Sequence, residues 1–224
     1  MTGDSAMGSW NLTIHVWVRK FERNLEDHGL KTALSKTFSY LLHFAYAKNF
    51  YRLYRINLLE PTEPSSPLEG VEFRWLTLND ETAINEIEEN SEWLKGTVRG
   101  RLRAGAICLA GFEDGRLAGF NLISFGEVYM PLVRISRRFR GDEAWSEQIA
   151  TVKNYRKKGL ASQLRYRAFE ELRRRGIRIF YGGALADNLP SLKLARRVGF
   201  HEFVEIHYLR VFQWKRWKYV RIKN

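Results

Sequence analysis

The sequence predicts an α/β (α+β) fold preceded by an N-terminal helical extension, and three observations support this. After residue 70, apolar and polar residues first alternate as they do in strands, and the pattern then changes to strand, helix, strand and helix. Before residue 60, apolar residues recur at every third or fourth position, which is typical of an amphipathic helix. Between these parts, the stretch from Glu60 to Pro67 contains three prolines and cannot continue a helix. We therefore expect a helical extension over residues 1–60, a linker over residues 61–70 and one domain over residues 71–224.

The extension is expected to form one long helix within residues 11–59. Its apolar stripe has a spacing of three and four residues and consists of Leu30, Ala33, Leu34, Phe38, Leu41 and Ala45. Tyr40, Phe44 and Tyr51 widen this apolar face beyond one stripe. An isolated amphipathic helix is marginal in water, so the face needs a partner. Three partners are open: the domain itself, which we favour, a second subunit in a homodimer, or a membrane surface.

The domain after the linker is expected to combine strands and helices. Expected strands occupy residues 71–76, 106–112, 117–125, 144–152, 177–184, 202–212 and 217–222. Expected helices occupy residues 80–103, with Asp80 as the cap, 160–175 and 191–198. A tight hairpin turn is expected at residues 113–116, and residues 126–141 are expected to form a loop.

The composition excludes several classes of protein. The chain has 224 residues, of which 45% are hydrophobic and 28% are charged, as in ordinary globular proteins. Its one cysteine, Cys108, excludes an internal disulfide framework and a cysteine-rich zinc site. Its five histidines lack the spacing of metal ligands. We therefore expect a cytoplasmic protein without a metal, associated with a membrane only if the extension binds one.

The strongest motif is a basic, glycine-containing loop between a strand and a helix. Arg156, Gly159 and Ala161 form the pattern R-x-x-G-x-A just before the expected helix. The first N–H groups of a helix have no partner within it, and the helix dipole adds positive charge there. The motif therefore predicts a phosphate-binding loop, although so short a motif alone is more often an ordinary helix start. In the helix that follows, four arginines are expected largely outside the buried stripe: Arg165, Arg167, Arg173 and Arg174.

A second motif follows at a fixed distance, with Asn188-x-x-Ser191 preceding Gly199-Phe200. In this order and spacing the two motifs resemble those of the GNAT acetyltransferase superfamily, and the resemblance covers residues 71–222. It implies a mixed, mostly antiparallel twisted sheet flanked by helices. It also implies an N-acyltransferase that moves an acyl group, most simply acetyl, from CoA to an amine by direct attack. The implied partner is an amine acceptor, a small molecule or a peptide, and not a specific nucleic acid.

The resemblance also implies where acetyl-CoA, or another acyl-CoA, binds as co-substrate. The pantetheine arm would follow the strand that ends near residue 152, and the pyrophosphate would bind at the loop. Asn188 would lie beside the arm, and Ser191 would either contact the arm or cap the next helix. The implied residues are Thr151, Val152, Lys153, Arg156, Lys157, Lys158, Gly159, Leu160, Ala161, Ser162, Asn188 and Ser191. One departure is Ala195, which stands where many members have a tyrosine proposed to protonate the departing thiolate.

A carboxylate is expected to assist the reaction, because an amine with a pKa of about 10.4 is protonated at neutral pH. A general base contributes about 10²- to 10⁴-fold. Glu147 is the first choice and Glu143 the second, since two-residue alternation puts both on one face of the strand. A strand face without a catalytic role explains either residue equally well. The candidate acids are Tyr129, Tyr181 and Tyr208, although core packing is the simpler interpretation of each.

Two other classes of function compete with the enzyme. The net charge of +12 is uneven, since residues 151–224 contain 19 basic and 5 acidic residues, and such a region attracts nucleic acid or anionic lipid as well as a phosphorylated cofactor. Near the C-terminus, aromatic and basic residues alternate as they do in modules that bind single-stranded nucleic acid. The alternatives are therefore a basic nucleic-acid-binding module and a peripheral-membrane protein with a non-catalytic GNAT-like domain. Both rank below the acyltransferase.

Overall fold

The computed structural model describes residues 46–62, 68–91 and 93–222. The chain divides into two compact units. One comprises Asn49–His207 and Trp217–Asn224, and it contains every predicted site residue except the candidate acid Tyr208. The other comprises Met1–Lys48 and Tyr208–Arg216. The helix expected within residues 11–45 lies outside the described residues.

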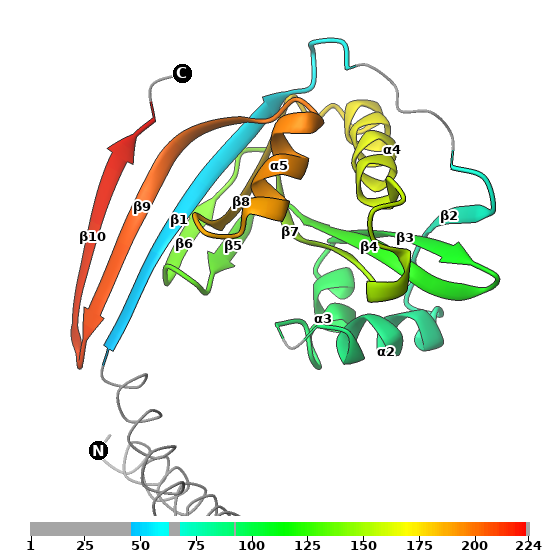
Figure 1. Ribbon diagram of the computed structural model, residues 1–224, viewed down its shortest axis with the longest axis horizontal. Helices are drawn as coiled ribbons and strands as arrows, with labels where there is room; N and C mark the ends of the chain where they lie inside the picture. The colour runs from blue at the N-terminus through cyan, green and yellow to red at the C-terminus, as the bar shows by residue number, and fades with distance from the viewer. Residues whose placement is uncertain (1–45, 63–67, 92, 223–224) are drawn as a thin grey trace, which may run out of the picture. The chain divides into compact units, whose positions relative to one another are not determined.

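Among the described residues, eight strands form one sheet in the order β10-β9-β1-β8-β7-β4-β3-β2 (Figure 1). The strands of this sheet are β1 (Tyr46–Asn57), β2 (Val71–Trp75), β3 (Ile107–Glu113), β4 (Arg116–Ser124), β7 (Glu143–Thr151), β8 (Ile179–Leu185), β9 (His201–Val211) and β10 (Trp214–Arg221). Strand β7 runs parallel to β8, whereas the β1–β8, β2–β3, β3–β4 and β4–β7 pairs are antiparallel. The expectation of a mixed, mostly antiparallel sheet is confirmed.

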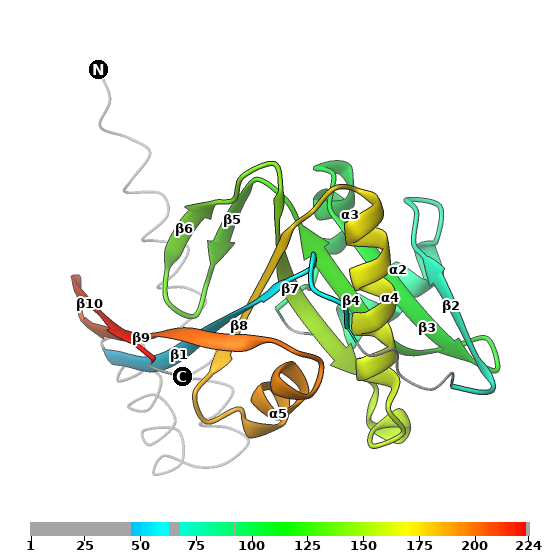
Figure 2. The same ribbon diagram turned by 90° about the horizontal axis from the view of Figure 1, so that it is seen from above.

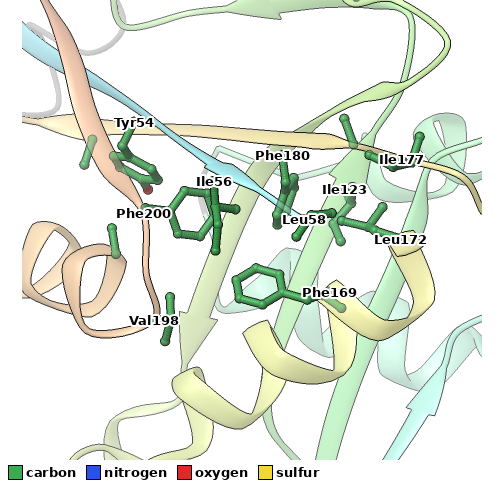
Figure 3. Close-up of a cluster of buried hydrophobic side chains, with 14 of the residues drawn as sticks. Tyr54, Ile56, Leu58, Ile123, Phe169, Leu172, Ile177, Phe180, Val198 and Phe200 are labelled. Carbon is green, nitrogen blue, oxygen red and sulfur yellow. The ribbon is translucent and has the colours of Figure 1, made fainter. Parts of the chain in front are cut away.

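Helices flank both faces of the sheet. The helices α2 (Glu81–Glu89) and α3 (Val98–Arg103) lie on one face, and α4 (Leu160–Arg174) and α5 (Leu189–Arg197) lie on the other (Figures 1 and 2). Figure 3 shows the core under α4, where Phe169 points from the helix toward Phe180 and Phe200. The ring centroid of Phe169 lies 6.1 Å from that of Phe180 and 5.7 Å from that of Phe200. This packing fixes α4, and with it the loop at its N-terminus, against the sheet.

The expectation that the N-terminal helix continues to Leu59 is wrong, because Tyr46–Asn57 forms strand β1. The helical spacing of the apolar stripe ends at Ala45. Beyond it, Tyr54, Ile56 and Leu58 are buried at two-residue intervals, while Arg55 and Asn57 are exposed, which is the period of a strand. Strand β1 pairs with β8 along seven residues of each strand. The last part of the expected extension therefore belongs to the main sheet.

The single helix expected over residues 80–103 is also wrong, because α2 and α3 are separate. Gly96, between them, has a φ of +69°, a backbone conformation that glycine adopts readily and that interrupts a helix. The Glu88 carboxylate accepts hydrogen bonds from the N–H groups of Gly96 at 2.7 Å and Val98 at 3.0 Å, which stabilises the interruption. Asp80 does precede α2, but its carboxylate accepts from the N–H and hydroxyl of Thr77 instead of capping the helix.

Of two expected connections, one is confirmed and one is wrong. The turn at residues 113–116 is a tight hairpin in which Asp114 and Gly115 have φ values of +52° and +74°, the signs that a type I′ turn requires. Residues 126–141, expected as a loop, contain a second small sheet of β5 (Glu127–Met130) and β6 (Ile135–Arg138). In β5, buried Val128 and Met130 alternate with exposed Tyr129, but a strand of four residues gives too short a pattern to recognise.

Candidate functional site

Strands β7 and β8 separate after a short parallel pairing. They pair over three residues of each strand, from Glu143 opposite Ile179 to Trp145 opposite Tyr181. Beyond Trp145, β7 continues to pair with β4, and β8 continues to pair with β1. The edge of β7 that faces β8 is therefore without strand partners from residue 146 to residue 151 in the described chain. A ligand with amide groups can pair with this edge as an added strand would.

A cavity of 340 Å³ lies where β7 and β8 diverge, and we call it the β7–β8 cavity. Its lining includes Glu147 and Ile149 of β7, Gly183 of β8 and Asn188 at the start of α5. A second cavity of 490 Å³, lined by residues of α3, β5 and the end of β4, is called the α3–β5 cavity. Both linings include Glu147. Molecules that occupy the two cavities would therefore meet at this carboxylate.

The loop after β7 presents backbone N–H groups to solvent. Five consecutive N–H groups, those of residues 157–161, donate to no acceptor in the described part of the chain. Gly159 precedes α4 with a φ of +87°, and a Cβ built on it would meet no atom within 4 Å. Lys157 also has a positive φ, of +66°. Unpaired N–H groups at a helix N-terminus, beside an open glycine, form a site for an anion such as phosphate.

The side chains of this loop have different surroundings. The guanidinium of Arg156 donates to the backbone carbonyl of Thr151 at 3.1 Å, and Lys158 forms an ion pair with Glu113 at 3.3 Å. Lys153 and Lys157 are exposed. Three further predicted residues are engaged within the fold: the Val152 N–H donates to the Ala118 carbonyl, the Ser162 N–H donates to the Gly159 carbonyl, and the side chains of Leu160 and Ser162 are buried. Ala161 is half-buried in the first turn of α4.

Asn188, not Ser191, caps helix α5. The helix begins at Leu189, two residues before the expected start, and the Asn188 side-chain oxygen accepts a hydrogen bond from the Ser191 N–H at 3.3 Å. Pro190 fits the first turn because its missing N–H would have no partner there. Both Asn188 and Ser191 line the β7–β8 cavity.

Glu147 is the extra residue of a β-bulge in β7. Ile123 of β4 lies opposite Ser146 and Leu122 lies opposite Gln148, so Glu147 has no partner in the register. The Glu147 carboxylate forms an ion pair with Arg101 of α3 and accepts a hydrogen bond from the Ser124 hydroxyl at 2.5 Å.

Glu143 has structural partners and does not join Glu147. It is 4% exposed and accepts hydrogen bonds from the Arg140 N–H at 2.9 Å, the Arg140 guanidinium at 3.2 Å and the Tyr181 hydroxyl at 3.1 Å. Burial raises the pKa of Glu143, but these hydrogen bonds outweigh burial, and the pKa lies below its usual value. Within the described residues, Glu143 lines neither cavity.

The candidate acids also fall in different places. Tyr129 is exposed and lines both cavities together with Glu147. Tyr181 donates its hydroxyl to Glu143, and Tyr208 belongs to the other unit of the chain. Ala195 is buried in the core on α5, so position 195 contributes packing alone.

Sequence analysis did not identify Arg101, Ser124 or Arg165 as site residues. Arg101 and Ser124 contact Glu147 from elements that are distant in the sequence, and no local pattern predicts such contacts. Arg165 was expected largely outside the buried stripe of its helix, but it is 2% exposed and lines the β7–β8 cavity. Phe169, one turn later and fully buried, is the signal that the buried face extends over this side of α4.

The described ranges also bear on metal binding, membrane spanning and cysteine chemistry. Among these residues, no group of three His, Cys, Asp or Glu side chains is placed to hold a metal ion. No helix of this part of the chain is long and apolar enough to cross a membrane. Burial raises the pKa of the Cys108 thiol to about 12, so Cys108 is not a nucleophile at neutral pH.

Comparison with known proteins agrees with this geometry. The model of the acetyltransferase (GNAT) family matches residues 50–200, and the chain therefore belongs to this family of transferases. The match begins within β1, which agrees with the assignment of β1 to the main sheet. No curated protein sequence matches the chain.

Several solved structures share the fold. A GCN5-related N-acetyltransferase from Sphaerobacter thermophilus matches with a TM-score of 0.54 and 18% identity, over 88% of this chain and 59% of that one. A GCN5-related N-acetyltransferase from Kribbella flavida matches with a TM-score of 0.53 and 13% identity, over 82% of this chain and 64% of that one. A protein of the GNAT family from Novosphingobium aromaticivorans matches with a TM-score of 0.52 and 20% identity, over 70% of this chain and 63% of that one. This chain thus spans about three fifths of the length of each of these proteins, and at such identities the likeness concerns the fold.

Proposed function

We propose that this protein transfers an acyl group, most simply acetyl, from a CoA thioester to the amine of a small molecule or a peptide. The observation that carries the proposal is the order of three features along one path. The loop with unpaired N–H groups at residues 157–161 follows β7. A cavity opens between β7 and β8, and the Glu147 carboxylate lies at the border of the two cavities. An acyl-CoA has the same order of groups, with phosphates, an amide-containing arm and a thioester.

The residues present fit an acyl-CoA as co-substrate. The N–H groups of residues 157–161 would bind the pyrophosphate, with Lys153 and Lys157 as nearby cations. The unpaired edge of β7 would pair with the amides of the pantetheine arm. Because the Asn188 oxygen is used to cap α5, its Nδ2 group remains to donate a hydrogen bond to the arm.

Glu147 is the proposed general base. The acceptor would enter through the α3–β5 cavity as an ammonium ion and lose a proton to the Glu147 carboxylate, directly or through one water. The neutral amine then attacks the thioester carbonyl carbon, a C–N bond forms, and the C–S bond breaks with its electron pair leaving on the thiolate. The second amine proton goes to solvent, and the thiolate takes a proton from solvent or from Tyr129, which lines both cavities. Arg101 holds the Glu147 carboxylate in place throughout.

The test is calorimetric binding of acetyl-CoA to the full chain, followed by incubation of the protein and acetyl-CoA with a panel of amines. Saturable binding, together with an acylated amine detected by mass spectrometry, would support the proposal. A chain that binds no CoA compound would contradict it. A nucleic-acid module would instead bind single-stranded nucleic acid with an affinity that falls steeply with salt.

A further inference from the structure

Arg165 of α4 is a buried cation with unused hydrogen-bond donors. The side chain is 2% exposed, and its Nε and Nη1 atoms have no hydrogen-bond partner among the residues that the structure describes. Burial lowers the pKa of Arg165, but a guanidinium remains protonated in proteins. The buried carboxylate of Glu202 is already paired with Arg52 at 2.9 Å and Arg196 at 2.6 Å. Placing an unpaired charge in a protein interior is costly, so a bound anion would relieve this cost.

Arg165 lies near the closed end of the gap between β7 and β8. Its guanidinium carbon is 5.3 Å from the ring centroid of Phe180 and 5.3 Å from that of Phe200, two rings that Figure 3 shows in the core under α4. Phe180 is opposite Ala144, in the middle of the three-residue pairing of β7 with β8. Arg165 therefore lines the β7–β8 cavity near the point where the strands are still joined.

The direction of the proposed donor brings its acyl group toward this end. The anion-binding loop follows β7 at Thr151, which is the open end of the gap. An arm that starts there and runs along β7 passes Ile149 and reaches Glu147, close to the closed end at Trp145. The acyl chain is attached beyond the arm, so it extends into the region that Arg165 faces.

We propose that Arg165 binds a carboxylate at the end of the donor's acyl chain, so that the enzyme selects the CoA thioester of a dicarboxylic acid over one with an uncharged acyl chain. This inference rests on the proposed function and specifies its donor. A guanidinium offers parallel N–H groups that match the two oxygens of a carboxylate. Tyr54, whose hydroxyl lies 3.5 Å from the Gly183 carbonyl, lines the same cavity and provides a second polar group there.

The experiment compares three ligands in calorimetry with the full chain: CoA, butyryl-CoA and succinyl-CoA. The last two have acyl chains of similar length and differ in ending with a methyl or a carboxylate group. We expect the wild-type protein to bind succinyl-CoA at least about tenfold more tightly than butyryl-CoA. Arg165→Leu should abolish this difference while keeping the affinity for CoA itself, and Arg165→Lys should retain part of it. The control is Arg167→Leu on the exposed side of the same helix, where the guanidinium stacks on Phe73.

The alternatives give different results. If Arg165 instead donates to the pantetheine arm, Arg165→Leu will weaken CoA, butyryl-CoA and succinyl-CoA equally, and the inference is wrong. Equal affinities of the wild-type protein for the two acyl-CoA ligands would also overturn it, while CoA binding would leave the proposed function intact. A chain that binds none of the three ligands would overturn both. Thermal unfolding checks the variants, and Arg165→Leu should not lower the melting temperature, because it removes a buried charge.

Discussion

Arg101 of α3 and Glu147 of β7 form an ion pair although they are 46 positions apart in the sequence. The pair joins α3 to the residue that the register of β7 with β4 skips between Trp145 and Thr151. Only 10% of the Glu147 side chain is exposed, and both residues line both cavities. The bulge thus directs a carboxylate to the place where the donor and acceptor would meet, and Arg101 holds it there.

Glu147→Gln should lower the turnover of amine acylation by about 10²- to 10⁴-fold, because the amide cannot accept the proton of the ammonium. Binding of acetyl-CoA should change little, since the phosphate and arm contacts are elsewhere. Steady-state kinetics on an acceptor found by the amine panel, together with calorimetry, measures both effects.

Glu143→Gln is the matched comparison, because Glu143 lies on the same strand but outside both cavities. It should retain turnover under conditions where the variant is folded. Full activity of Glu147→Gln would refute its role as base, and full activity of the double variant would eliminate both carboxylates.

Gly159→Asp should raise the dissociation constant for acetyl-CoA about tenfold or more, because a carboxylate would stand beside the N–H groups that are proposed to bind phosphate and would repel it. Gly115→Asp is the control. Both glycines have a positive φ, of +87° and +74°, and open space where a Cβ would lie, so the backbone strain of the two variants is similar.

Calorimetry on both variants separates a local effect on the loop from general destabilisation. Equal losses of affinity in the two variants, or unchanged affinity in Gly159→Asp, would show that the phosphates bind elsewhere.

The sequence was most informative where local geometry decides the structure. The open conformation of Gly159 and the N–H groups of the first turn of α4 follow from a strand, a glycine and a helix in succession, and this segment was predicted with nearly correct bounds. The turn at Asp114 and Gly115 was predicted for the same reason, since its conformation depends on two neighbouring residues. Such features can be predicted because all the residues that determine them are neighbours in the sequence.

The errors concern features that depend on distant partners. Strand β1 was expected as helix because its aromatic residues also fit a wide helical face, and the short alternation from Tyr54 to Leu58 becomes decisive only with the pairing to β8. Two-residue alternation put Glu147 and Glu143 on one face and kept Glu143 as the second candidate, because the contacts of Glu143 with Arg140 and Tyr181 are made only in the folded chain. Likewise, arginines such as Arg165 are usually exposed, and its burial depends on Phe180 and Phe200.

Glu143→Gln should lower the free energy of unfolding at pH 7 by about 1–3 kcal/mol, because it weakens three hydrogen bonds to a buried carboxylate. The pKa of Glu143 is lower in the folded chain than its usual value, so its ionised form stabilises the fold above that usual value, about 4.3. This stabilisation is lost as the pH falls toward the lower pKa of the folded chain.

The difference between wild type and Glu143→Gln should therefore shrink from pH 7 to pH 3 in urea denaturation experiments. Glu72→Gln, at an exposed position of β2, should change stability by less than about 0.5 kcal/mol at either pH. A difference that grows on acidification would mean that Glu143 is held in its protonated form.

Asn188 is expected to have two functions that different substitutions can separate. Its oxygen caps α5 by accepting from the Ser191 N–H, and its Nδ2 group is proposed to donate to the pantetheine arm. Asn188→Ala removes both groups, so it should cost about 1 kcal/mol of stability and weaken acetyl-CoA binding. Asn188→Asp keeps an oxygen that caps the helix equally well but has no donor, so it should keep the stability and still weaken binding.

Ser191→Ala should leave stability within about 0.5 kcal/mol of wild type, because the hydroxyl is not the cap. Chemical denaturation and calorimetry on the three variants give both quantities, and if Asn188→Asp binds acetyl-CoA as tightly as wild type does, Asn188 is a helix cap alone.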